Sequence, residues 1–198
     1  MRVLVTGSTR GLGLELLGSF FVNGYDVVMN GRNKIDTDHE AIWSDASFIK
    51  PEDLKEKNIG IVVNNAFDKS RPITAGCSQV LLLNTAIEYF QESSIEGIIL
   101  NINSIAAIDR VLDSDYCIAK QFLMDASKSK KKQAYAFGIT IIDVYPGAIK
   151  TDWTKDRVDW DDLIDPKELA EHIVHMVSAS NFYYDEVIIR RTNANRKK

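Results

Sequence analysis

The sequence predicts an α/β protein built on a doubly wound parallel sheet of about seven strands, with helices on both faces. Two observations predict this fold class. Short runs of apolar, mostly β-branched residues recur along the chain, as in strands that are buried on both faces. Between them lie segments whose apolar residues recur at intervals of three and four, as in amphipathic helices. Strands that alternate with helices form a parallel sheet covered on both sides.

The apolar runs give the strands in order. The clear ones are Val3–Val5, Val27–Met29, Ile61–Val63, Ile98–Ile102, Ile139–Val144 and Val187–Ile189, and Ala41–Trp43 is a weaker one. Helical spacing is carried by Leu12–Phe21, Val80–Phe90, Ile118–Met124 and Leu169–Val177. The segment between the second and third strands is barely long enough for a parallel crossover.

Length, composition and charge limit the function classes. The chain has 198 residues, 45% hydrophobic and 26% charged, which fits one domain over residues 1–190 and a basic tail over residues 191–198. A net charge of -4 favours neither a nucleic acid nor an anionic membrane as partner. No apolar run approaches the ~20 residues of a membrane span, so we expect a cytoplasmic protein. Cys77 and Cys117 are too few for a disulfide framework or a zinc site, and we expect no metal.

The stretch TGSTRGLGLE follows the first predicted strand and opens the first predicted helix. Gly7 permits a tight turn, Gly11 lets the backbone approach a pyrophosphate, and Gly13 lets helix and sheet pack closely. The amino end of the helix adds free N–H groups and partial positive charge. The pattern predicts a phosphate-binding turn, against the alternative of a loop that is merely rich in glycine. The residues expected at the phosphates are Gly7, Ser8, Thr9, Arg10, Gly11, Leu12 and Gly13.

Tyr116 and Lys120 stand four residues apart, so on a helix they share one face. A neighbouring ammonium stabilises a phenolate, and we therefore expect Lys120 to lower the pKa of Tyr116. Ser104 follows a central strand, where its hydroxyl reaches the ligand crevice at the carboxyl ends of the strands. Taken singly, a surface tyrosine–lysine pair or a strand-ending serine would give the same pattern.

Several motifs follow one another in order. They are TGSTRGLG, NNA at Asn64–Ala66, Asn84 within LLLNT, Ser104 within NINS, Tyr116 and Lys120 within YCIAK, and PGAIKT at Pro146–Thr151. In this order and spacing, the motifs resemble the short-chain dehydrogenase/reductase family, whose members begin with T-G-x-x-x-G-x-G. The resemblance covers most of the chain and implies a Rossmann-type dinucleotide-binding domain.

The resemblance implies hydride transfer between a nicotinamide cofactor and a carbonyl or alcohol substrate. Tyr116 is the expected acid–base group, Ser104 orients the substrate oxygen, and Lys120 tunes Tyr116 and hydrogen-bonds the nicotinamide ribose. Asn84 is expected to be buried and to hold a water that links Lys120 to solvent. The alternative is a non-enzymatic dinucleotide sensor or partner-binding protein on the same fold, which needs no acid–base tyrosine.

The second predicted strand ends without the carboxylate that NAD-binding folds place on the ribose 2′-OH. Arg32 stands there instead, and Arg10 lies within the glycine turn. Two guanidinium groups suit a 2′-phosphate, so we expect NADP(H) in preference to NAD(H). By resemblance, the remaining cofactor contacts are Asp45, Asn65, Ala66, Tyr116, Lys120, Pro146, Gly147, Ile149 and Thr151.

The chain departs from the family pattern in several places, and two of them concern the pocket. Phe67 stands where a glycine usually follows NNA. The segment after Thr151 is short, which predicts a more open pocket with a small lid, where Trp153 and Trp160 contact substrate or simply pack. The family also implies a homodimer or homotetramer. The helix faces expected to pair across subunits carry Tyr89, Phe90, Phe122 and Met124.

Overall fold

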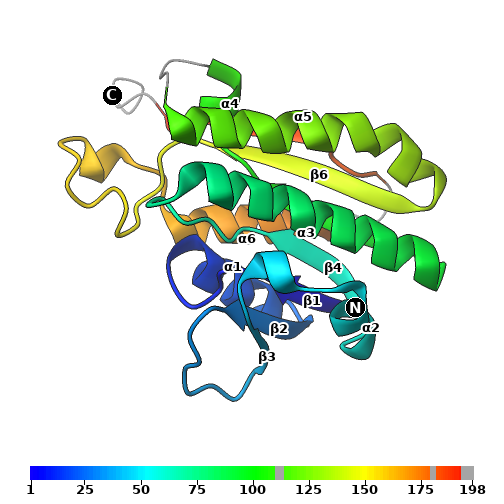
Figure 1. The fold of residues 1–198 in the computed structure, drawn as a ribbon. Coiled ribbons are helices and arrows are strands. Elements are labelled where there is room, and N and C mark those ends of the chain that lie inside the picture. The colour runs from blue at the N-terminus through cyan, green and yellow to red at the C-terminus, as the bar shows by residue number, and fades with distance from the viewer. Residues whose placement is uncertain (110–113, 179–181, 193–198) are drawn as a thin grey trace.

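The computed structural model describes residues 1–109, 114–178 and 182–192 (Figure 1). Seven strands form one sheet in the order β3–β2–β1–β4–β5–β6–β7, and all neighbours run parallel. The predicted doubly wound α/β fold is confirmed, with the expected seven strands. Residues 193–198 of the predicted tail lie outside the described residues.

The strands coincide with the predicted apolar runs, most of them extended by a few residues. They are β1 (Arg2–Val5), β2 (Asp26–Gly31), β3 (Glu40–Trp43), β4 (Ile59–Asn64), β5 (Gly97–Ile102), β6 (Ile139–Pro146) and β7 (Glu186–Ile189). The long helices are α1 (Gly11–Val22), α3 (Pro72–Ser93), α5 (Asp115–Ala136) and α6 (Pro166–Val177). Shorter segments, in which periodicity cannot show, are α2 (Pro51–Glu56), α4 (Ala106–Asp109), and the 3₁₀ turns η1 (Ala46–Phe48) and η2 (Trp160–Asp162). Across the described ranges, no helix combines the length and apolarity needed to cross a membrane.

Helices cover both faces of the sheet, because successive strand residues point to opposite sides. Val3 and Val5 of β1 pack with Phe20 of α1 and with α6, whereas Leu4 faces α3 and α5. Figure 1 shows α3 and α5 side by side in front of the sheet, and α1 and α6 behind it. Burying a side chain of this size stabilises the fold by about 1.5–3 kcal/mol. The two cores, one on each face, hold the sheet in place, and the motifs lie along one edge of it.

The outer faces of α3 and α5 differ from the prediction. Tyr89, Phe90 and Met124 are buried, because they lie on the sides of the helices that face the sheet. The hydroxyl of Tyr89 donates a hydrogen bond to the carbonyl oxygen of Ile59 at 2.9 Å. Phe122 is exposed, as expected. Other exposed apolar side chains on these helices are Ile73, Leu81, Ile118 and Tyr135.

The strand order creates a crevice at one edge of the sheet. β2 and β3 lie on one side of β1, and β4 to β7 lie on the other. Connections that leave β1 and β4 therefore diverge, and the carboxyl ends of these strands border an open crevice. The glycine turn follows β1, Phe67 follows β4, Ser104 follows β5 and residues 147–151 follow β6. The predicted motifs thus collect at a single edge.

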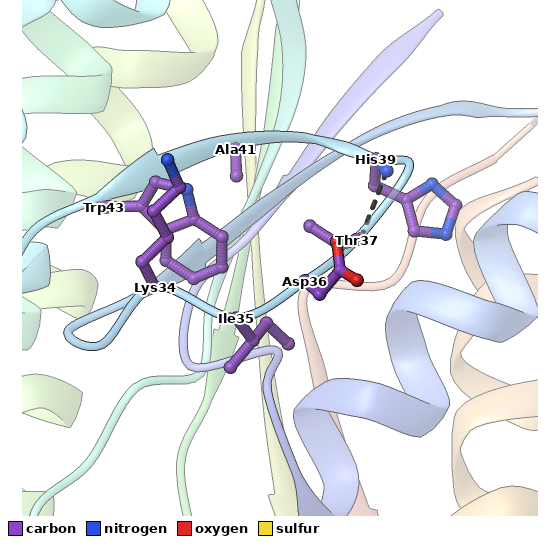
Figure 2. A pocket seen from close by; sticks show the side chains of 7 residues that line it. All are labelled: Lys34, Ile35, Asp36, Thr37, His39, Ala41 and Trp43. Carbon is purple, nitrogen blue, oxygen red and sulfur yellow. Dashed lines mark hydrogen bonds between the residues drawn. The ribbon is translucent and has the colours of Figure 1, made fainter.

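The crossover from β2 to β3 is a loop, since residues 32–39, all of them described, form no helix. The loop and β3 enclose a hollow of about 500 Å³, which Figure 2 shows from close by. The backbone N–H of His39 donates to Oγ1 of Thr37 at 3.1 Å and tightens the loop. Lining residues of the hollow are Lys34, Ile35, Asp36, Thr37, His39, Ala41 and Trp43. β3 is therefore only half-buried.

Candidate active site

The glycine turn between β1 and α1 has the backbone that the sequence predicts. Gly7 and Gly11 adopt φ angles of 64° and 55°, which residues with a Cβ rarely adopt. A Cβ on Gly13 would lie 2.2 Å from the carbonyl oxygen of Gly7, so only glycine fits there. Within the described residues, no side chain caps the amino end of the twelve-residue helix α1. Its first N–H groups therefore point to the place where a phosphate would bind.

The other residues of the turn anchor it to the fold. Ser8 is buried, and its N–H donates to the carbonyl oxygen of Asn30 at 3.0 Å, while its Oγ accepts from the Asn30 N–H at 3.0 Å. The methyl of Thr9 lies against the end of β2. Arg10 is the exposed residue that precedes α1, and Leu12 is part of the core. Of these four side chains, Arg10 is the one presented to solvent.

Residues after β4 and β6 meet the glycine turn. Oγ1 of Thr6 accepts hydrogen bonds from the N–H groups of Asn65 at 3.0 Å and Ala66 at 3.1 Å. Nδ2 of Asn65 donates to the carbonyl oxygen of Thr6 at 2.9 Å. A Cβ built on Gly11 would lie 3.7 Å from the methyl of Thr151. The structure therefore brings the turn, residues 65–66 and Thr151 together.

The path from β6 to Thr151 is fixed by backbone bonds. Pro146 ends β6, and the N–H of Gly147 donates to the carbonyl oxygen of Ile189 at 2.8 Å. Ile149 then pairs with Ile164 in an isolated parallel bridge. These bonds fix the path of residues 147–151 from the edge of the sheet to the glycine turn.

The two residues expected at the ribose and adenine both have partners within the chain. Arg32, half exposed, forms an ion pair with Asp68, with 2.8 Å between Nη1 and Oδ2. Hydrogen bonds from Ser70 and Arg32 hold the pKa of Asp68 well below its usual range, so this carboxylate stays charged. Oδ1 of Asp45 accepts from the backbone N–H and Oγ of Ser47, at 3.1 and 2.8 Å, and caps η1. A phosphate at Arg32 would compete with Asp68.

Ser104, Tyr116 and Lys120 come together where β5 ends and α5 begins. Oγ of Ser104 accepts a hydrogen bond from the N–H of Ala106 at 3.2 Å, which leaves its proton to point elsewhere. Burial raises the pKa of Tyr116, and a hydrogen bond with Ser104 opposes part of the rise. The prediction that the pKa of Tyr116 is lowered is therefore wrong in direction. Desolvation of the phenolate outweighs this hydrogen bond.

Lys120 is buried and points to neutral oxygen atoms. Its Nζ donates to Oε1 of Gln79 and to the carbonyl oxygen of Ile102, both at 3.0 Å. Burial lowers the pKa of Lys120 to about 7. Asn84, expected to be buried near Lys120, is instead exposed on α3.

The residue that sequence reasoning missed is Gln79. It is 1% exposed and takes the buried polar position that was expected of Asn84. Their separation of five positions corresponds to about 140° of rotation around α3, so the two side chains leave the helix in different directions. Gln79 precedes the buried residues Leu82 and Leu83 by three and four positions, and this spacing is the signal that identifies it.

The ring of Phe67 lies in the middle of the site. Its centroid is 5.4 Å from that of Tyr116 and 5.7 Å from that of Trp153, both near edge-to-face. Nζ of Lys120 lies 4.4 Å from the centroid of the same ring. Three aromatic rings therefore pack together beside Lys120. Trp160 lies apart from them in η2, with its ring 5.9 Å from the Lys150 ammonium.

Known proteins resemble this chain in sequence and in fold. Residues 74–162 match the family model described as short chain dehydrogenase. The 3-oxoacyl-(acyl-carrier-protein) reductases FabG of Chlamydia pneumoniae and Haemophilus influenzae are 28% and 29% identical to this chain. These alignments cover 77% and 79% of this chain, and 75% and 77% of the relatives.

Solved structures share the fold. ElxO with NADP bound has a TM-score of 0.77 at 19% identity, over 100% of this chain and 99% of that one. The 3-ketoacyl-(acyl-carrier-protein) reductase from Brucella melitensis, complexed with NADH, has a TM-score of 0.78 at 21% identity, over 96% of each chain. The family match spans Ser104, Tyr116 and Lys120, and these solved structures share the fold of the chain. Together, the family match, the FabG relatives and the shared fold support the chain as a member of the short-chain dehydrogenase/reductase family.

Proposed function

We propose that the protein is an NADP(H)-dependent oxidoreductase that transfers hydride between the nicotinamide and a carbonyl or alcohol substrate. The observation that carries the proposal is the meeting of Ser104, Tyr116 and Lys120 at the carboxyl end of β5, on the same edge of the sheet as the glycine turn. This edge is where open parallel sheets bind ligands.

The glycine turn fits a dinucleotide. Its positive φ angles and the absent Cβ of Gly13 leave backbone N–H groups at the amino end of α1 open to phosphate oxygens. Residues 65–66 and Thr151 border the turn and are the next expected contacts. A bound nicotinamide dinucleotide supplies or accepts the hydride.

Three side chains have distinct roles in this proposal. The raised pKa of Tyr116 keeps its hydroxyl protonated at neutral pH, which suits a group that gives a proton to a carbonyl oxygen during reduction. In the reverse direction, Tyr116 takes the proton back. The hydroxyl of Ser104 donates a hydrogen bond to the same substrate oxygen and stabilises its negative charge. Lys120 supplies a fixed donor beside them.

Arg10 and Arg32 support a preference for NADP(H) over NAD(H). Guanidinium groups bind a 2′-phosphate well, and both arginines follow strands at the carboxyl edge. Nicotinamide fluorescence titrations with NADPH and NADH test this preference. We expect Arg32→Ala to weaken NADPH about tenfold and to leave NADH unchanged. Asp68→Asn keeps Arg32 but removes the carboxylate that competes with the 2′-phosphate for it, so NADPH should bind more tightly. Equal effects on both cofactors would overturn the preference.

The substrate class is proposed from the chemistry of the site and from the relatives. A reductase with a protonated tyrosine acts on a carbonyl, and the FabG relatives are named as 3-oxoacyl-(acyl-carrier-protein) reductases. A 3-oxoacyl thioester is therefore the first substrate to assay, with NADPH oxidation as the readout. Tyr116→Phe should bind NADPH normally and lose turnover. Turnover that survives in Tyr116→Phe would contradict the role of Tyr116.

One observation favours the alternative, a dinucleotide-binding protein without turnover. The ring of Phe67 lies against both Tyr116 and Lys120, where a reacting group would have to enter. Wild-type protein that binds NADPH but turns over no carbonyl, and is unchanged by Tyr116→Phe, would support this alternative.

We also propose that the protein is a homo-oligomer that pairs through α3 and α5. The exposed residues Leu81, Ile118 and Phe122 form part of the apolar surface that such pairing would cover. Sedimentation at micromolar concentration tests this, and a monomer under those conditions would rule it out.

A further inference from the structure

Lys120 is held by partners that carry no formal charge. Its Nζ donates to Oε1 of Gln79 and to the carbonyl oxygen of Ile102, and the face of Phe67 lies 4.4 Å away. These groups come from α3, β5 and the loop after β4, and Tyr116, one turn earlier on the same helix, lies against the same Phe67 ring. The two oxygen acceptors therefore determine the direction of the side chain.

The amide of Gln79 can take only one orientation. Its Nε2 donates to the carbonyl oxygen of Asn64 at 3.2 Å, while its Oε1 faces Lys120. A flipped amide would place N–H groups against an ammonium and an oxygen against a carbonyl, which would break both bonds. Asn64 also bonds Gln79 in the other direction, since its Nδ2 donates to the backbone oxygen of Gln79 at 2.8 Å.

The bonds continue from Asn64 through the sheet. Nδ2 of Asn64 also donates to Oδ1 of Asn101 at 2.9 Å, and Nδ2 of Asn101 donates to Oδ1 of Asp143 at 3.0 Å. Asp143 is fully buried and pairs with Lys131, with 2.8 Å between Nζ and Oδ2. Because unpaired polar groups are costly in the interior, each side chain in this series fixes the next. Gln79 is thus supported from three adjacent strands.

We propose that Gln79 is the positioning residue of Lys120, with its Oε1 orienting the ammonium at the catalytic centre. This rests on the proposed function, in which Lys120 belongs to the reaction centre. Asn84 cannot replace Gln79, because it is exposed on another side of α3. Gln79 itself touches neither substrate nor cofactor in this proposal and acts through Lys120.

Two substitutions change the acceptor in opposite ways. Gln79→Glu puts a carboxylate beside Nζ, which should raise the pKa of Lys120 by about one unit or more. Gln79→Met keeps the approximate size and removes the acceptor, which should lower that pKa. Carbon-13 NMR of protein labelled at the lysine Cε carbons follows each titration, and Lys120→Met identifies the Lys120 signal. A general loosening of the core would not produce shifts of opposite sign.

The matched control is Gln133→Glu, which adds the same charge at an exposed site on α5. It should leave the pKa of Lys120 unchanged. In the proposed reaction, Gln79→Met should lower kcat by about tenfold or more, with little change in KM. If Gln79→Met does not fold, Gln79→Glu alone tests the proposal: a raised pKa of Lys120 supports the positioning role, and an unchanged or lowered pKa rejects it.

The outcomes separate the two proposals. Opposite pKa shifts without turnover in the wild type would support the positioning role and reject the reductase. Normal turnover with an unshifted Lys120 in both variants would reject the positioning role alone. Shifts of the same sign in both variants would also reject it.

Discussion

At the scale of single residues, Phe67 lies against the side chains of the candidate site. Its ring makes near edge-to-face contacts with Tyr116 and Trp153 and lies over the Lys120 ammonium. Aromatic pairs contribute about 0.5–1.5 kcal/mol, and a cation over a ring contributes a similar amount. A ligand that has to displace the ring loses these contacts.

We therefore expect Phe67→Ala to bind NADPH about tenfold more tightly than the wild type, since about 1.4 kcal/mol corresponds to that factor. Nicotinamide fluorescence titration measures the change. Phe48→Ala, which truncates a phenylalanine that is 73% exposed, is the control and should bind normally. Weaker binding by Phe67→Ala would mean instead that the ring is a wall of the occupied site.

The contrast between Asn84 and Gln79 shows how far residue types predict a site. The motifs identify Ser104, Tyr116 and Lys120, which the fold brings together. They identify the wrong partner on α3, because a motif gives an order along the chain and not a direction around a helix. Helical spacing supplies that direction, since Gln79 shares a face with buried Leu83. The pKa shifts depend on burial by distant segments, which local sequence does not specify.

At the scale of elements, the glycine turn and α1 offer a matched pair of substitutions. A Cβ on Gly13 would overlap the carbonyl oxygen of Gly7, whereas a Cβ on Gly18 would meet nothing within 4 Å. Both glycines lie in α1, where alanine is the better helix former by about 1 kcal/mol.

We expect Gly13→Ala to lower the free energy of unfolding by about 1–3 kcal/mol and to abolish NADPH binding, because the turn must shift to admit the methyl group. Gly18→Ala should raise the free energy of unfolding by up to about 1 kcal/mol and leave binding unchanged. Urea denaturation and cofactor titration measure both. A Gly13→Ala protein that binds normally would show that the phosphates bind elsewhere.

The elements themselves are predicted well where they are long and buried. Continuous apolar runs such as Ile139–Val144 identify strands because parallel strands bury both faces. The crossover after β2 is predicted only as short. Ala41 and Trp43 of the strand that follows it pack against the core, and local pattern does not reveal these contacts. Helix α2, with six residues, is too short to show a periodicity.

At the scale of the whole molecule, the buried Lys120 links stability to pH. Its pKa of about 7 in the folded chain lies below its ordinary value of 10.5. Between these values the unfolded chain binds the additional proton, so the free energy of unfolding should rise with pH. The slope from this one group is up to about 1.4 kcal/mol per pH unit.

Urea denaturation of the wild type and of Lys120→Met between pH 7 and 9 measures this contribution. The wild type should gain stability relative to the variant as the pH rises, because the variant lacks the titrating group. Comparing the two proteins cancels the titration of shared groups such as Lys131. A constant difference across this range would show that the pKa of Lys120 is not lowered by burial.

Because a loop and not a helix joins β2 to β3, the backbone at this edge of the sheet is open to hydrogen exchange. β3 has four residues, pairs with β2 at one edge of the sheet and borders the hollow at Trp43. Backbone amides of such an edge strand exchange with solvent through local fraying, whereas those of β1 and β4, buried between neighbours, exchange through global unfolding. The strand beside the cofactor's expected ribose end is therefore an edge strand with little protection. A dinucleotide bound there would slow deuterium uptake by the backbone amides of β3 more than uptake by the central strands. Hydrogen exchange would therefore detect cofactor binding even without turnover.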